Sequence, residues 1–110
     1  MPDTLPIVKG SLDILILKTL SWGPMHGFEI TRWIEDSSAQ LFSVDDSALY
    51  QSLHRMEERG WIVAEWGITE HKRRARYYKM SPAGRAQLRE DSERWLQYAA
   101  TLTEVLSATA

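Results

Sequence analysis

The sequence of 110 residues predicts a mainly helical α+β protein with three short helices, a β-hairpin and a long helix at its C-terminal end. Two patterns support this fold class. Apolar residues recur with helical spacing before residue 60 and again after residue 82. Between these segments, two stretches rich in Val, Ile, Trp and Tyr flank a polar loop that opens with Gly67, which is typical of a hairpin.

The first helix is predicted over residues 8–21 and ends at a turn, because Gly23 and Pro24 both break helices. It is apolar around most of its circumference, so we expect it to lie at the centre of a small core. Its apolar side chains are Leu12, Ile14, Leu15, Ile16, Leu17 and Leu20.

The second helix is predicted over residues 26–37. His26 follows the Gly-Pro turn and is expected to cap the helix or pack there. Residues 37–43 are interpreted as a connector that could include a very short strand. The side chains expected to pack inward are Phe28, Ile30, Trp33 and Ile34.

The third helix has the clearest boundaries. Ser43, Asp45 or Asp46 can cap its beginning, and Gly60 suits the left-handed residue just after its end. Its inward stripe consists of Leu49, Leu53 and Met56. The residues that point most nearly away from this stripe are Ser47, Gln51, His54 and Glu58, with Tyr50 and Arg55 on the flanks.

Two strands are predicted next, over residues 61–66 and 75–80. Residues 71–79 hold five of the 13 Lys and Arg residues and none of the 15 Asp and Glu residues. This segment therefore carries a charge of +5, while the rest of the chain carries −7. The hairpin thus forms a local cationic surface on an acidic body, although a solvated basic loop without a partner would have the same composition.

The last helix is predicted to begin at Ser81 and Pro82, since Ser is a good N-cap and Pro is tolerated in the first turn. A helix of about 25 residues is about 37 Å long, whereas a domain of about 80 residues has a radius of gyration of about 12 Å. One small domain cannot bury its whole apolar seam, so we expect a second copy of the chain to cover it. Along this seam, Leu88, Trp95 and Leu102 recur every seven residues, as do Ser92, Ala99 and Leu106. The predicted dimer interface comprises Leu88, Trp95, Leu96, Ala99, Leu102 and Leu106.

This order of elements is that of a winged helix-turn-helix. The major groove of B-DNA admits one α-helix, whose N-terminal half usually contacts base edges, and a cationic hairpin can neutralise neighbouring phosphates. A polar helix face or an Arg-rich loop is often merely solvated, but the two together have few other common uses. The residues predicted to bind double-stranded DNA on this basis are Ser47, Gln51, His54, Lys72, Arg73, Arg74 and Arg76.

Several segments resemble the PadR family of bacterial transcriptional regulators, in order and in spacing, over about residues 8–95. They are residues 9–17 (KGSLDILIL), 23–30 (GPMHGFEI), 47–57 (SALYQSLHRME), 60–62 (GWI) and 73–78 (RRARYY). Two departures are visible. Gln51 stands where proline is common in the family, and Phe28 stands where tyrosine is common; neither change threatens the fold.

The resemblance implies a winged-helix DNA-binding domain over residues 1–80, a dimerisation helix over residues 81–110 and, in most members, repression at a pseudo-palindromic operator. It implies that Tyr50 contacts the DNA backbone. It also implies the short subfamily, in which a single helix follows the winged helix. Family members often respond to small planar or phenolic compounds. A pair of Trp95 indoles across the seam could sandwich such an aromatic effector, or could simply fill the interface.

Other classes of function are less compatible with the sequence. The three histidines lie on different predicted elements, and no cysteine is present, so neither an enzyme nor a metal or other cofactor is predicted. A protein-interaction module that has lost DNA binding is an alternative, which the net charge of −2 favours slightly. Glu57 and Glu58 are expected to form surface ion pairs with Arg55 and Arg59.

The chain also lacks the sequence patterns of membrane and export segments. Its longest strongly apolar run, residues 12–17, contains Asp13 and is too short to span a bilayer. Residues 1–9 lack a basic region followed by an apolar stretch and a cleavage site. We therefore expect a cytoplasmic protein without a membrane partner.

Overall fold

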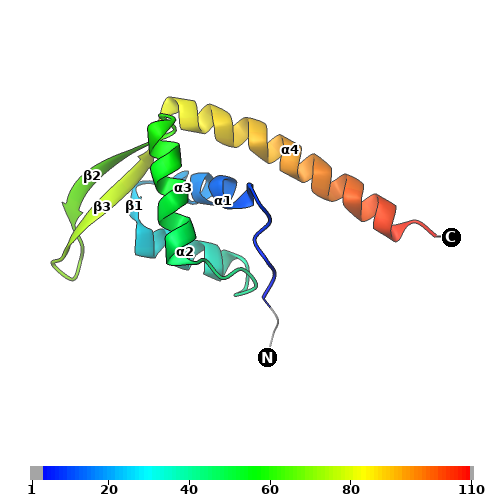
Figure 1. The fold of residues 1–110 in the computed structure, drawn as a ribbon, viewed down its shortest axis with the longest axis horizontal. Coiled ribbons are helices and arrows are strands. Elements are labelled where there is room, and N and C mark those ends of the chain that lie inside the picture. Colours follow the sequence, from blue (N-terminus) through cyan, green and yellow to red (C-terminus); the bar gives the residue numbers. More distant parts are fainter. Residues whose placement is uncertain (1–3, 110) are drawn as a thin grey trace.

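The computed structural model describes residues 4–109, and its elements follow the predicted α+β order (Figure 1). They are α1 (Ser11–Leu20), β1 (Met25–His26), α2 (Gly27–Ser37), α3 (Asp46–Glu58), β2 (Ile62–Ile68), β3 (Arg74–Met80) and α4 (Pro82–Ser107). Residues 1–3 of the predicted DNA-binding domain and Ala110 of the predicted dimerisation helix lie outside the described residues. No helix in the described part of the chain is both long and apolar enough to cross a membrane.

The predicted hairpin is part of a larger antiparallel sheet with the strand order β1-β3-β2. The extra strand, β1, pairs Met25 with Tyr78 and His26 with Tyr77. A strand of two residues has no periodicity to detect, so β1 is not predictable from the sequence pattern. The very short strand considered in the connector is a single bridge, in which Phe42 pairs with Leu5.

Local contacts set the starting points of the first two helices. Helix α1 begins at Ser11 rather than at residue 8, because Gly10 has a φ of +90° and interrupts helical geometry. Helix α2 follows His26, whose side chain accepts a hydrogen bond of 3.4 Å from the backbone N–H of Glu29. The Glu29 carboxylate accepts one of 3.1 Å from the His26 N–H in return, which completes a capping box. The capping role predicted for His26 is confirmed.

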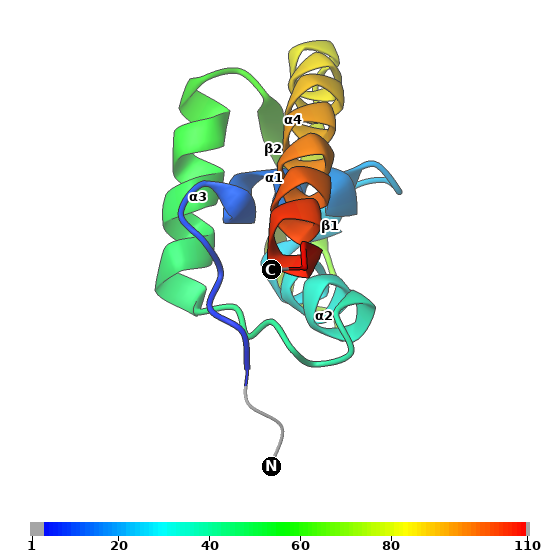
Figure 2. The same ribbon diagram turned by 90° about the vertical axis from the view of Figure 1, so that its right-hand side faces the viewer.

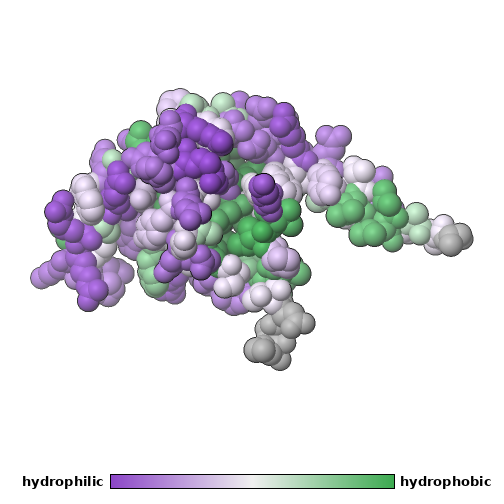
Figure 3. All heavy atoms as spheres, in the orientation of Figure 1, coloured by the Kyte–Doolittle hydropathy of each residue, from purple (hydrophilic) through white to green (hydrophobic). Residues whose placement is uncertain are grey.

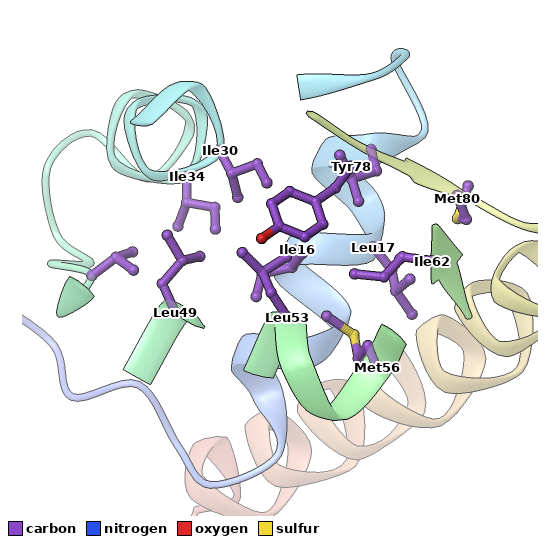
Figure 4. Close-up of a cluster of buried hydrophobic side chains, with 12 residues drawn as sticks. Ile16, Leu17, Ile30, Ile34, Leu49, Leu53, Met56, Ile62, Tyr78 and Met80 are labelled. Carbon is purple, nitrogen blue, oxygen red and sulfur yellow. The ribbon is translucent and has the colours of Figure 1, made fainter. Parts of the chain in front are cut away.

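The core lies between the three short helices and the sheet, with α1 at its centre as predicted (Figure 4). The inward stripe predicted for α3 is fully buried. Phe28 was expected to pack inward, but this prediction is wrong, because its side chain is 66% exposed. It precedes Ile30 by two residues, which on a helix places the two side chains on nearly opposite faces. The buried core side chains labelled in Figure 4 are Ile16, Leu17, Ile30, Ile34, Leu49, Leu53, Met56, Ile62, Tyr78 and Met80.

Helix α4 starts against the body and then leaves it (Figures 1 and 2). Ser81 is its N-cap and Pro82 lies in its first turn, as predicted. In this first turn, Gly84 is buried against the backbone of Trp61. The distal half of the helix projects beyond the domain and contributes to its longest extent of 58 Å. Its side chains from Leu96 to Ser107 are exposed.

Candidate nucleic-acid interface

Helix α3 is fixed at both ends by residues close to it in the sequence. The Asp45 carboxylate accepts a hydrogen bond of 3.1 Å from the backbone N–H of Ala48, so Asp45 is the N-cap among the three candidates. Gly60 follows the end of the helix with a φ of +75°, the left-handed conformation expected from the sequence. Both capping residues lie outside Asp46–Glu58, so the side chains on the outward face of α3 are not used to cap the helix.

The outward face of α3 is polar and accessible. Ser47, Gln51 and His54 are all exposed, as predicted. The imidazole Nε2 of His54 lies 3.1 Å from a carboxylate oxygen of Glu58, one turn further along the helix. This face carries hydroxyl, amide and imidazole groups, which can donate or accept hydrogen bonds at base edges.

The basic segment forms the turn and the return strand of the hairpin. The turn is closed by hydrogen bonds from the Thr69 N–H to the Arg73 carbonyl (2.8 Å) and from the Lys72 N–H to the Thr69 carbonyl (2.9 Å). Lys72, Arg73 and Arg74 are exposed. Within residues 4–109, no carboxylate lies within ion-pair distance of these three cations. Their charge is therefore available to an anionic partner.

Arg76, the fourth predicted cation, has a different environment. Its guanidinium lies 3.0 Å from the Glu57 carboxylate, so this ion pair joins β3 to α3. The prediction that Arg55 and Glu57 pair with neighbours along α3 is wrong. Arg55 instead reaches Asp13 on α1 at 2.7 Å. The Arg55–Asp13 pair therefore links α3 to α1, and the Arg76–Glu57 pair links α3 to the hairpin.

A groove of about 1170 Å³ is lined by α2 and by the turn and return strand of the hairpin. The Tyr50 hydroxyl lies there so close to Gly27 that a Cβ on this glycine would be 2.5 Å from it. A helix N-terminus attracts anions, because its backbone N–H groups and its dipole both favour negative charge. The charged residues lining the groove are Glu29, Arg32, Asp36, Glu70, Arg73, Arg74 and Arg76, together with His26 and His71.

Sequence reasoning missed the contribution of α2 to this groove. Arg32 lies 5.8 Å from the centroid of the Phe28 ring, and both side chains are exposed beside the groove. The spacing of these two residues, one helical turn apart, is the sequence signal that indicates this contribution. The structure therefore adds Arg32 and the N-terminal end of α2 to the candidate anion-binding surface.

Tyr78 connects this surface to the core. Burial raises the pKa of its hydroxyl above the ordinary value of 10.0, and the nearby Arg76 guanidinium offsets part of that rise. The Arg76 guanidinium also lies 5.9 Å from the centroid of the Tyr78 ring. The hydroxyl is therefore neutral at ordinary pH, and the ring supports the Arg76–Glu57 pair from the core side.

The residues predicted for the dimer interface fall into two groups. Leu88 is half-buried and packs against the core of its own chain. Trp95 is also half-buried; a Cβ on Gly10 would lie 4.0 Å from its indole, and the Tyr98 ring packs edge-on with centroids 6.3 Å apart. The exposed group comprises Leu96 (71%), Ala99, Leu102 (45%) and Leu106 (75%). Only this group, on the distal half of α4, is largely open to a partner.

The part of the chain that the structure describes contains no cluster of side chains suited to bind a metal ion. Across residues 4–109, His, Asp and Glu side chains form no group of three that could hold a metal ion. The three histidines are separated: His26 caps α2, His54 lies on α3 and His71 lies in the loop of the hairpin.

Comparison with known proteins identifies the family. The family model described as "Transcriptional regulator PadR-like family" matches residues 16–90. This chain belongs to the PadR-like family. The transcriptional regulator Rv3488 of Mycobacterium tuberculosis is 32% identical over 83 residues, which cover 76% of this chain and 74% of that protein. A solved structure of a transcriptional regulator from Clostridium thermocellum superposes with a TM-score of 0.80 at 28% identity and covers 89% of this chain and 95% of that one.

A third relative is the negative transcriptional regulator PadR of Bacillus subtilis. It is 25% identical over 79 residues, which cover 72% of this chain and 43% of that protein. Its structure in complex with operator DNA superposes with a TM-score of 0.67 and covers 80% of this chain and 47% of that one. The PadR-like chain described here is therefore a transcriptional regulator with a winged-helix fold, and not an enzyme.

Proposed function

We propose that this PadR-like protein acts as a homodimeric repressor in which α3 reads base edges and the hairpin grips the adjacent DNA backbone. The observation that carries this proposal is the polar, exposed face of α3 beside three cations without acidic partners in the described chain. The base-reading residues are Ser47, Gln51 and His54. The residues proposed to contact the backbone are Tyr50, Lys72, Arg73, Arg74 and Arg76.

The Arg76–Glu57 pair supports a common orientation of the two DNA-binding elements. At 3.0 Å, it links the return strand directly to the last turns of α3. A fixed angle between a recognition helix and a hairpin allows both to contact one duplex without rearrangement, which reduces the entropic cost of binding. In this arrangement Arg76 contacts the backbone next to α3 while its pair with Glu57 fixes β3 in place, and the residues at the tip contact phosphates further along.

A double substitution of Arg73 and Arg74 by Ala tests the role of the hairpin. Loss of two phosphate contacts should weaken binding to every duplex alike and reduce the slope of log affinity against log salt by about 2 per hairpin. Gel-shift titration at several salt concentrations measures both effects. Unchanged affinity and slope would show that the hairpin does not contact DNA.

The dimer is proposed from the exposed apolar surface of α4. Figure 3 shows hydrophobic side chains gathered at the distal end of this helix and on the body facing it, while hydrophilic side chains dominate the hairpin. Clustered exposed apolar side chains usually mark an interaction site. A second copy that covers the distal half of α4 would bury them and would place two α3 helices to read a pseudo-palindrome with half-sites about 10 bp apart, or a multiple of that. The exposed apolar side chains on the distal half of α4 are Leu96, Tyr98, Leu102, Val105 and Leu106.

An effector site is proposed at Trp95, where α4 leaves the body. Its half-buried indole lies against Tyr98 and near Gly10, so a flat aromatic compound could stack on the indole and shift how α4 is held. Titration of tryptophan fluorescence with flat aromatic compounds tests this idea, with Trp95→Phe as the comparison. A Trp95→Phe variant that binds the compounds as well as the parent would exclude the site.

A further inference from the structure

One side of the hairpin faces the core near the body, and the same side extends past the core towards the tip of the hairpin. The β2–β3 register pairs Ile62 with Met80, Ala64 with Tyr78, Trp66 with Arg76, and Ile68 with Arg74. Because side chains alternate between the two sides of a sheet, the eight residues of these pairs share one side. Near the body this side is buried, with Ile62 only 1% exposed. Towards the tip the same side is open.

Two apolar residues on this open part have no core to bury them. Trp66 is 63% exposed and Ile68 is 64% exposed. A large apolar side chain on the solvent-exposed end of a strand is common, so exposure alone carries no function. The decisive feature is what lies on the indole: the Arg74 guanidinium carbon is 4.7 Å from the centroid of the Trp66 ring. This is the shortest cation–π contact among residues 4–109.

The side that carries Trp66 and Arg74 also faces α3. Arg76 lies on it directly opposite Trp66 in the register, and its guanidinium reaches Glu57 of α3 at 3.0 Å. A duplex that contacts the outward face of α3 therefore passes on the same side of the hairpin as the Trp66 indole. Unlike Arg76, Arg74 has no carboxylate within ion-pair distance in the described chain, so its charge remains available while its position is restricted.

We propose that Trp66 is a positioning residue that holds the Arg74 guanidinium over its indole, ready to bind a phosphate of the DNA backbone. The inference rests on the proposed function of the hairpin. A free arginine loses much rotational freedom when it binds a phosphate, and a planar contact with an indole restricts it beforehand. Stacking leaves the N–H groups at the edge of the guanidinium free to donate to phosphate oxygens.

A double-mutant cycle on Trp66→Ala and Arg74→Ala tests the proposal, with a mixed-sequence DNA duplex as the probe. The duplex needs no known operator, because phosphate contacts are independent of sequence. Trp66→Ala should weaken binding about two- to five-fold for each hairpin that contacts the duplex, the range expected for an exposed cation–π contact. In the Arg74→Ala background, the same substitution should have no effect. Trp66→Phe, which keeps a π face, should recover part of the lost affinity.

A matched control is Trp22→Ala. Trp22 is 66% exposed and lies under a cation, with the Lys18 ammonium 5.7 Å from its ring centroid, but it is on the turn after α1 and not on the hairpin. Its substitution should leave duplex affinity unchanged. Thermal unfolding of each variant, together with the Trp66→Phe affinity, separates loss of positioning from loss of folding.

Each outcome has a distinct meaning. Equal weakening by Trp66→Ala with and without Arg74 would overturn the proposal, because Trp66 would then contact DNA directly or support the fold. Affinity of Trp66→Ala equal to that of the parent would also overturn it, while leaving the role of the hairpin intact. Failure of the parent protein to bind any duplex at low salt would instead refute the proposed function itself.

Discussion

Gly84 allows a sharp test of how α4 is seated on the winged-helix body. It lies in the first turn of α4 and is buried. A Cβ at this position would overlap the carbonyl oxygen of Trp61 and lie 2.8 Å from Cγ of Met80. The Met80 side chain can move, but the Trp61 carbonyl is fixed, because it accepts a hydrogen bond of 3.0 Å from the N–H of Ser81.

Two effects of Gly84→Ala have opposite signs. Helix propensity alone favours alanine over glycine by about 1 kcal/mol. The overlap with a fixed backbone atom forces α4 away from the sheet, and overpacking of this kind typically costs about 1–3 kcal/mol or more. Since the overlap is with backbone rather than with a flexible side chain, we expect the steric effect to prevail. For a domain of this size, each kcal/mol lost lowers the melting temperature by about 4–8 °C.

Thermal unfolding followed by circular dichroism measures the effect, at one protein concentration because association would raise the melting temperature. The control is Gly60→Ala, at a glycine with a φ of +75° where no atom outside residues 59–61 lies within 4 Å of an added Cβ. That variant should lose about 1 kcal/mol through backbone strain alone. A Gly84→Ala variant that melts at or above the temperature of the parent would refute the packing of α4 described above.

Four further predictions follow from the structure. Gln51→Ala should change which duplex sequences are preferred and leave the salt slope unaltered, as a binding-site selection experiment would reveal; a uniform loss across all sequences would contradict base contact. Leu102→Glu should place a charge in the proposed dimer interface and convert dimer to monomer in sedimentation velocity, whereas an unchanged dimer would exclude the distal half of α4 as the interface. Asp45→Ala should remove the N-cap of α3 and cost about 1 kcal/mol in urea unfolding. Because burial raises the pKa of Tyr78, its contribution to stability is present below pH 10 and should be lost as pH rises above it; Tyr78→Phe should reduce this loss.

Features of the chain that depend on neighbouring residues were predictable from the sequence. Asp45, Gly60 and Ser81 mark the ends of α3 and the start of α4, since each acts on backbone groups a few residues away. The same holds for His26, which exchanges two hydrogen bonds with Glu29. The buried stripe and the exposed polar face of α3 followed from helical periodicity. The charge of the hairpin could be counted directly.

Features that depend on residues far apart in the sequence became clear only in three dimensions. Arg76 meets Glu57 and Arg55 meets Asp13 because folding brings their elements together, and no local pattern distinguishes these partners from nearer ones. The strand β1 exists only because β3 offers it a free edge, and Phe28 is exposed because α2 is oriented by Ile30 and Ile34. The placement of Arg74 over Trp66 requires the register of the hairpin. Periodicity and caps thus specify which elements form, whereas side-chain partners depend on how those elements pack, because packing selects among many long side chains of similar reach.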